Sequence, residues 1–226
     1  MMKNIGMIVA IEIDAVLNKF GKPVEELRFA GFTVFQYKLG DNNLYVVNSG
    51  IGQIAAAAAT QFLITKFNVD LIVNFGVVGG LTQEMTLTKT CIVESVVHYD
   101  FDTSDIFDCC VGRYPDYPGV YIPATKEIVD KSLEIEPTLK KVICASGDKF
   151  VSSKEKKEEL HKAFNADICE MEAAGIVLTC NRNKVPCLLI KTVSDSVEGG
   201  AEEFKNMIDE SARICLELAA NIIEKI

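Results

Sequence analysis

The sequence predicts a single α/β domain in which a mixed, twisted central β-sheet is flanked by helices. Strand-like and helix-like segments alternate along the chain, as expected for a sheet with helices on its faces. Several strand segments are continuous apolar runs, such as residues 71–73, which suits a sheet covered on both faces. At 226 residues and 49% apolar content the chain can bury one large core, so we expect one domain over residues 1–226.

Hydrophobic periodicity and local start signals place the individual elements. Strands are predicted at residues 4–11, 32–37, 43–48, 70–75, 90–97, 141–145 and 186–193. Helices are predicted at residues 52–66, 124–134, 153–164, 171–182 and 201–225. Ser152 with Glu155 predicts a capping box at the start of helix 153–164, and we interpret the basic run 154–157 as a solvated face of that helix. The segment Tyr99–Pro118 is the longest predicted loop, and such loops are usually functional or form interfaces.

Composition argues against several classes of function. The net charge is −9, which disfavours nucleic acid or an anionic membrane as a partner. The first apolar stretch spans only about seven residues before Glu12 and Asp14, too short and too acidic for a secretion signal or a membrane helix. The eight cysteines form no C-x-x-C pair and only two histidines are present, so we expect buried thiols, a cytoplasmic location and no metal site.

The most informative stretch, residues 169–173, contains Glu170 and Glu172, and Asp195 follows 23 residues after Glu172. The two glutamates precede an apolar segment that predicts a buried helix, and acids at a helix start favour its dipole. Taken alone, they are ordinary helix-start acids. Asp195, however, closes a buried strand, which is where open α/β sheets bind ligands. The carboxylates together therefore predict a ligand site at the carboxyl edge of the sheet.

One glycine-rich segment suggests an alternative. Residues 50–55 fit the G-x-G-x-x-A pattern of a dinucleotide-binding turn. The pattern follows the third predicted strand rather than the first, and Asp70 precedes the next strand instead of ending it. We therefore interpret the glycines as a tight turn close to a small ligand, in preference to a nicotinamide site.

Six segments, in order, resemble the purine nucleoside phosphorylase and nucleosidase superfamily, and within it the 5′-methylthioadenosine/S-adenosylhomocysteine nucleosidases. They are residues 5–12, 49–56, 74–81, 146–150, 169–173 and 186–195. The likeness covers nearly the whole chain. It implies a nucleoside phosphorylase-like fold and a homodimeric enzyme without cofactor. Its substrate would be a small adenine nucleoside, from which it releases adenine by hydrolysing the N-glycosidic bond.

The resemblance also implies roles for individual residues. Asp195 would protonate adenine N7 and accept from the 6-amino group, with Ser194 orienting it. Glu172 would accept from the ribose hydroxyls and stabilise positive charge on the sugar. The other implied substrate-binding residues are Ile11, Ile51, Val77, Gly79, Phe150, Val151, Glu170, Met171 and Met207, with Phe107 and Pro118 reaching a partner subunit's site. Ordinary hydrophobic packing explains Phe107, Pro118, Phe150 and Met171 equally well.

Three positions depart from the nucleosidase pattern. Aligning residues 5–11 puts the family's water-activating glutamate at Asp14, with Glu12 two residues earlier. Either acid could activate water, or hydrolysis could be impaired. Lys191 stands where the family has an arginine, and Val77 replaces a hydroxyl residue. These changes bear on rate and substrate rather than on fold.

Water is nevertheless the expected nucleophile. Phosphorylases of this superfamily bind phosphate with arginines, whose fork matches its oxygens. Here Phe75 occupies the position of one such arginine, and none of Arg28, Arg113, Arg182 and Arg213 lies in a strand-end motif. The alternatives are a nucleoside phosphorylase, a nucleosidase for another 5′-modified nucleoside, and a nucleoside-binding protein with impaired hydrolysis.

Overall fold

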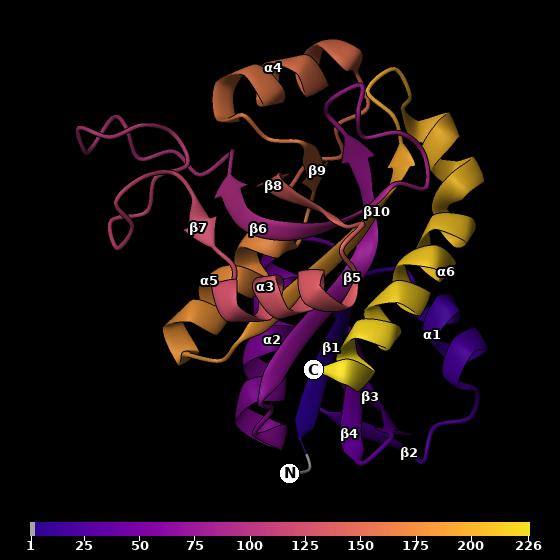
Figure 1. Ribbon diagram of the computed structural model, residues 1–226. Helices are drawn as coiled ribbons and strands as arrows, with labels where there is room; N and C mark the ends of the chain where they lie inside the picture. The colour runs from indigo at the N-terminus through magenta and orange to yellow at the C-terminus, as the bar shows by residue number, and fades with distance from the viewer. Residues whose placement is uncertain (1–2) are drawn as a thin grey trace.

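A 10-stranded mixed sheet forms the centre of the structure, a computed structural model that describes residues 3–226 (Figure 1). Its strands are β1 (Asn4–Val9), β2 (Glu25–Phe29), β3 (Phe32–Leu39), β4 (Asn42–Asn48), β5 (Leu71–Gly80), β6 (Thr90–His98), β7 (Ile122–Pro123), β8 (Lys140–Ser146), β9 (Ile168–Glu170) and β10 (Cys187–Asp195). The helices are α1 (Ile13–Phe20), α2 (Gln53–Phe67), α3 (Lys126–Ile135), α4 (Lys154–Phe164), α5 (Ala173–Asn183) and α6 (Ala201–Lys225). This confirms the predicted fold class.

Part of the sheet closes on itself. The strand order is β10-β6-β8-β9-β5-β1-β4-β3-β2, and β10 also pairs with β5. β5 pairs in parallel with β1 and β10, and the end of β5 pairs antiparallel with β9. As a result Gly79 of β5 lies opposite both Cys169 and Asp195. These pairings bring the ends of β9 and β10 to the C-terminal half of β5.

Helices cover both faces of the sheet. In Figure 1, α6 and α1 lie on one side, α2 and α5 on the other, α3 in front next to the end of α6, and α4 across the top. α6 packs on β5 and β10, and α2 packs against α5. Gly175 permits this second contact, because a Cβ there would lie only 2.5 Å from the carbonyl oxygen of Gln53. The starts of α2 and α5 are thereby held close together.

All predicted strands and helices are present, with shifted ends, but four short elements were not predicted. These are α1, β2, β7 and β9. β2 is a largely exposed edge strand, so it lacks the apolar alternation from which a strand is recognised. The start of α4 also differs from the prediction, since Ser153, not Ser152, caps it by accepting from the backbone N–H of Lys156.

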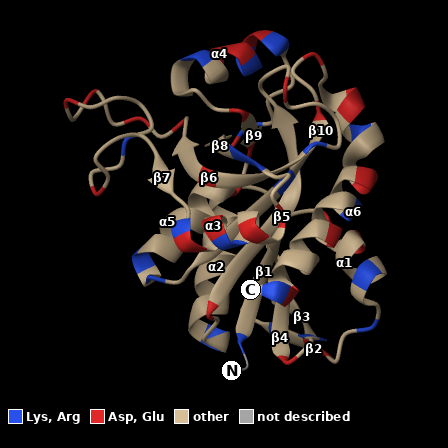
Figure 2. Cartoon of the chain, in the orientation of Figure 1, with Lys and Arg blue, Asp and Glu red and all other residues tan. Residues whose placement is uncertain are grey.

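The interpretation of residues 154–157 as a solvated face is wrong for one of them. Lys157 is fully buried, whereas the side chains of Lys154 and Lys156 pair with exposed glutamates. Figure 2 shows lysines and glutamates alternating along α4, so the helix presents a mixed charge to solvent. α4 is therefore amphipathic, with a lysine on its inner face.

Between β6 and β7 the chain forms a long segment, residues 99–121, that projects from the body of the molecule (Figure 1). Phe101 and Tyr114 stack inside it with ring centroids 4.0 Å apart. Ile106 and Phe107 remain 76% and 55% exposed. Exposed apolar side chains on a projecting segment are typical of an interface.

Six of the eight cysteines are buried, as the sequence predicted. Cys91, Cys144, Cys169, Cys180, Cys187 and Cys215 are buried. On the projecting segment, Cys109 is half-buried and Cys110 is exposed.

Candidate active site

Four acidic side chains are buried around the C-terminal half of β5. They are Glu12 (7% exposed), Glu170 (8%), Glu172 (8%) and Asp195 (1%). Burying a carboxylate is costly unless hydrogen bonds or charges compensate for the lost water. The contacts of each acid therefore indicate what it can do.

Glu12 lies between β1 and α1, and its side chain turns inward. Its Oε1 accepts a hydrogen bond from the backbone N–H of Val77 at 3.0 Å, and its Oε2 accepts from the N–H of Ile11 at 3.0 Å. Gly76 makes room for the carboxylate, because a Cβ there would lie 3.0 Å from Oε1. Each carboxylate oxygen can accept a second hydrogen bond. Glu12 is thus held in a position from which it can accept a proton.

Glu170 and Lys191 form a buried ion pair, with Nζ of Lys191 3.1 Å from Oε2 of Glu170. The same carboxylate accepts from the backbone N–H groups of Glu172 and Ala173, at the start of α5. Burial alone would lower the pKa of Lys191, but Glu170 and other nearby acidic groups raise it above its ordinary value. Lys191 therefore stays charged, and the contacts of Glu170 are those of a positioning residue.

Glu172 lies between the starts of α2 and α5. Its Oε1 accepts from the backbone N–H of Gly52 at 2.8 Å. Burial and the charge of Glu170 raise the pKa of Glu172 to about 7, while the Gly52 hydrogen bond acts in the opposite direction. A carboxyl group with this pKa changes charge near neutral pH. Its charge is therefore sensitive to any ligand placed against it.

Asp195 is the last residue of β10. Its Oδ1 accepts from the hydroxyl of Ser194 at 3.1 Å, and its Oδ2 lies 2.5 Å from Nζ of Lys157. Burial raises the pKa of Asp195, and Lys157 and Ser194 oppose this shift. Any side chain at position 79 would crowd it, because a Cβ there would lie 3.1 Å from Oδ2. A desolvated acid of this kind is suited to donate a proton.

Apolar side chains at the same strand ends are only partly covered. Phe150 is 40% exposed, and its ring packs edge-on against Phe204 of α6 with centroids 5.2 Å apart. Ile11 and Ile51 are 40% and 58% exposed. Half-buried Val77, Met171 and Met207 and buried Val151 are the remaining sequence-predicted apolar residues of this region. Exposed aromatic and aliphatic groups beside buried acids are typical of a binding site for a small ligand.

Three predicted residues are not part of this buried group. Asp14 lies on α1 with an exposed side chain. It lines a groove of about 590 Å³ between α1 and α6, whose lining also includes Ile11 and Glu12. Phe107 and Pro118 are exposed on the projecting segment. Between the two acids that the sequence left open, the structure places Glu12 rather than Asp14 against β5.

Sequence reasoning did not identify several residues that hold the acids in place. Lys157 contacts Asp195, and Asp148 accepts from the backbone N–H of Gln53 at the start of α2. The Gln53 side chain donates to Ser146 and accepts from the N–H of Gly175. The sequence signal for these residues was indirect, since Gln53 lies in segment 49–56 and Ser146 and Asp148 lie in segment 146–150. Nothing in local spacing distinguished Lys157 from its exposed neighbours.

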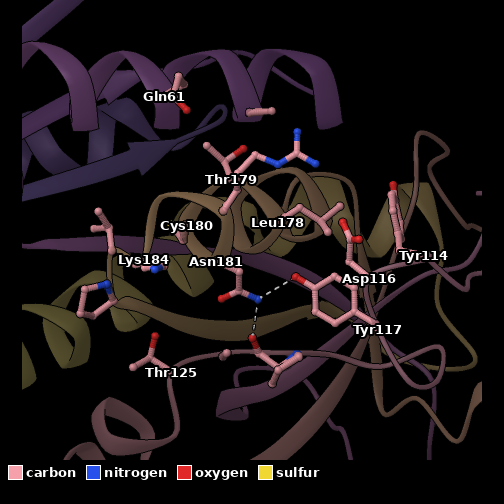
Figure 3. A pocket seen from close by; sticks show the side chains of 16 residues that line it. Gln61, Tyr114, Asp116, Tyr117, Thr125, Leu178, Thr179, Cys180, Asn181 and Lys184 are labelled. Carbon is pink, nitrogen blue, oxygen red and sulfur yellow. Dashed lines mark hydrogen bonds between the residues drawn. The ribbon is translucent and has the colours of Figure 1, made fainter.

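A second cavity, of about 1040 Å³, lies elsewhere (Figure 3). It is lined by α2, α5 and the projecting segment, and the Asn181 side chain donates there to the Tyr117 hydroxyl and the Pro123 carbonyl. None of the four buried acids lines it. Its charged lining residues, Asp116, Arg182 and Lys184, are exposed rather than buried, so the buried acids at β5 remain the candidate active site.

Within residues 3–226, no group of three or more histidine, cysteine, aspartate and glutamate side chains has a geometry that could hold a metal ion. No helix in that range is long and apolar enough to cross a membrane.

Known proteins resemble this chain over nearly its whole length. The family model of the phosphorylase superfamily matches residues 5–226. The chain is 32% identical over 216 residues to the 5′-methylthioadenosine/S-adenosylhomocysteine nucleosidase of Staphylococcus aureus (strain bovine RF122 / ET3-1), covering 92% of this chain and 93% of that protein. A mutant of the Helicobacter pylori nucleosidase, with 5′-methylthioadenosine in its active site, superposes with a TM-score of 0.94 at 27% identity over 100% of both chains. The native futalosine hydrolase of H. pylori strain 26695 superposes with a TM-score of 0.93 at 27% identity, covering 99% of this chain and 98% of that one.

Proposed function

Because the chain belongs to the phosphorylase superfamily, we propose that it hydrolyses the N-glycosidic bond of 5′-methylthioadenosine, S-adenosylhomocysteine or both. The products would be adenine and a 5-alkylthioribose. The observation that carries this proposal is the convergence of buried Asp195, Glu172 and Glu12 on the C-terminal half of β5. Cleavage requires an acid for the base, a group that holds the sugar and a base for water, and these three acids can supply those functions.

Asp195 would be the general acid. As the bond between C1′ and N9 breaks, its electron pair moves to the purine, and a proton from Asp195 neutralises the charge that appears at N7. Burial raises the pKa of Asp195, which favours the protonated form needed for this step. Ser194 and Lys157 fix the direction of the carboxyl group. Phe150, partly exposed near Phe204, is available to pack on the adenine face.

Glu172 would bind the ribose hydroxyls. Gly52 holds its Oε1, so Oε2 can accept hydrogen bonds from a diol. The ionised form would also stabilise the positive charge that develops on the sugar ring as the base leaves. Met171 and Met207, both half-buried, are suited to contact the sugar and its 5′ substituent.

Glu12 would accept the proton of the attacking water. Its carboxylate is fixed at Val77, whereas Asp14 is exposed on α1. Water would add to C1′ and lose its proton to Glu12, which completes hydrolysis without phosphate. Gly79, Ile11 and Ile51 remain proposed substrate contacts, and Glu170 is proposed to act through α5 and Lys191.

The charge of the site supports water over phosphate. Arg28 and Arg213 pair with glutamates on the surface, Arg113 lies on the projecting segment, and Arg182 is near the end of α5. Arg213 lines the groove between α1 and α6 together with Glu12, but its guanidinium is engaged by Glu217 of the same helix. A phosphate dianion placed beside the buried acids would face like charges without a free guanidinium to bind it.

We also propose that the active form is a homodimer. α2 exposes Ile54 (84%), and its apolar residues are not confined to one face, which favours a helix with a second apolar contact. The projecting segment exposes Phe107 and Pro118, which would then contribute to the partner's site. We place the enzyme in the cytoplasm and in methionine salvage. We treat residues 1–226 as one nucleoside phosphorylase/nucleosidase domain.

An adenine-release assay over 5′-methylthioadenosine, S-adenosylhomocysteine, futalosine and adenosine tests the proposal. We expect adenine from one or both of the first two, with Asp195→Asn as the inactive control. Preferential turnover of futalosine would assign the related hydrolase activity instead. Saturable nucleoside binding without base release would indicate a binding protein.

A further inference from the structure

Lys157 on α4 makes contacts that its sequence context did not suggest. Its side chain is 0% exposed, and Nζ donates to Oδ2 of Asp195 at 2.5 Å. Nζ also donates to the carbonyl oxygens of Ser196 at 2.6 Å and Gly199 at 3.0 Å. An ammonium has three donors, so these acceptors satisfy it completely. Because removing a lysine from water is costly, an apolar residue would be the simpler choice for stability.

The same contacts hold residues 196–199, the segment that follows Asp195. From α6, the Glu203 carboxylate accepts from the backbone N–H and the hydroxyl of Ser196 at 2.6 and 2.9 Å. Lys157 thus holds this segment from one side and Glu203 from the other. With Ser194 on Oδ1 and Lys157 on Oδ2, the Asp195 carboxyl group is fixed at both oxygens.

We propose that Lys157 is a positioning residue that aims the Asp195 carboxyl group at the purine and sets its charge. The inference rests on the proposed function, in which Asp195 gives its proton to N7. Lys157 does not transfer a proton in this scheme. It keeps its three hydrogen bonds while the Asp195 carboxyl group becomes a carboxylate, and the developing negative charge is stabilised by the adjacent ammonium.

This role predicts a particular pH dependence. Burial raises the pKa of Asp195, and the ammonium of Lys157 opposes that rise. The other ionisable groups facing Asp195 are Glu203 from α6, which raises the pKa, and Cys169 from β9, which lies beside the carboxyl group. Without Lys157 the pKa of Asp195 would therefore rise further. Since only protonated Asp195 can donate, the pH above which activity falls would move upward.

The test compares the pH dependence of kcat/KM for the parent, Lys157→Met and Lys156→Met. Lys156→Met removes the same charge from the same helix but leaves Asp195 untouched, so its profile should match the parent. For Lys157→Met we expect a loss of at least about tenfold at low pH and a basic limb shifted upward by about one unit or more. The ratio of variant to parent activity should then increase with pH. A ratio that is constant with pH would show a merely structural role and overturn the proposal.

Two further measurements keep the proposal testable. If Lys157→Met does not fold, Lys157→Met combined with Asp195→Asn removes both charges and can be compared with Asp195→Asn alone. A further loss of threefold or less supports action through Asp195, and a loss of tenfold or more refutes it.

Calorimetric titration with adenine at several pH values measures the effect of Lys157 on the charge of Asp195 without turnover. Absence of adenine release by the parent would refute the proposed function, whereas an unshifted pH dependence of adenine binding in Lys157→Met would refute only the role of Lys157.

Discussion

Replacing Glu12 by glutamine tests which acid activates water. Glu12 accepts two hydrogen bonds from the backbone N–H groups of Val77 and Ile11, each 3.0 Å long. Glutamine retains one acceptor and turns its NH₂ group toward the second N–H. Because a hydrogen bond to a charged group contributes about 1.5–3 kcal/mol, we expect the free energy of unfolding to fall by a similar amount. Loss of the general base should lower kcat by about two to four orders of magnitude.

Asp14→Asn is the matched control. Asp14 is exposed and lines the groove between α1 and α6, so the substitution should change the free energy of unfolding by no more than about 0.5 kcal/mol. We expect kcat within about tenfold of the parent, since the side chain does not face β5. Adenine release measures kcat, chemical denaturation measures stability, and calorimetry with 5′-methylthioadenosine measures substrate affinity.

The affinity measurement separates the role of Glu12 from a general disturbance of the site. Because the Glu12 carboxylate is assigned to water rather than to the nucleoside, substrate affinity should survive in Glu12→Gln. The reasoning fails if Asp14→Asn is the inactive variant that still binds substrate while Glu12→Gln turns over normally. That result would place the water-activating group on α1, at the position given by sequence alignment.

Further predictions concern the other acids, the nucleophile and the interface. Asp195→Asn should lower kcat by about two to four orders of magnitude without unfolding the protein, and a loss below tenfold would remove Asp195 from the mechanism. The folded-state pKa of Glu172 is about 7 against an ordinary 4.5, so stability should decrease as pH rises from about 4.5 through 7, by up to about 3 kcal/mol. Glu172→Gln should therefore raise Tm relative to the parent at pH 8 but not at pH 4, and a pH-independent difference would contradict this. Phosphate should neither accelerate turnover nor yield a ribose 1-phosphate, and detection of that product would indicate a phosphorylase. Ile54→Glu should shift sedimentation from dimer to monomer and lower activity, and an unchanged dimer would exclude α2 from the interface.

The fold was predictable because its determinants are local and repeated. Continuous apolar runs identified the interior strands, a capping signal supported helix 153–164, and a broad apolar face supported the last helix. The elements that were missed have weak local signals. β9 is only three residues long, and its place is set by pairing with β5 and β8 rather than by its own composition. Closure of β10 onto both β5 and β6 is likewise a property of long-range pairing, which periodicity cannot reveal.

The sequence indicated which strand ends carry acids. It could not indicate which way each acidic side chain points. Glu12 and Asp14 are two residues apart, and the alignment favoured the second of them. The chain leaves β1 after Val9 and enters α1 at Ile13, so Glu12 precedes the helix and can turn inward. On the first turn of α1, Asp14 faces solvent instead.

The buried acids differ in whether a lysine pairs with them, and this difference agrees with the roles assigned to them. The buried acids at the site are Glu12, Glu170, Glu172 and Asp195. Lys191 pairs with Glu170 and Lys157 pairs with Asp195, whereas within residues 3–226 no lysine or arginine lies within ion-pair distance of Glu12 or Glu172. The paired acids, Glu170 and Asp195, lie at the ends of β9 and β10. The unpaired acids are those assigned to water and ribose, where a cationic sugar would supply the missing positive charge as the glycosidic bond breaks. Because two of its acids have no cationic partner, the site binds the cationic transition state more tightly than the neutral substrate. The same unpaired negative charge disfavours the binding of phosphate.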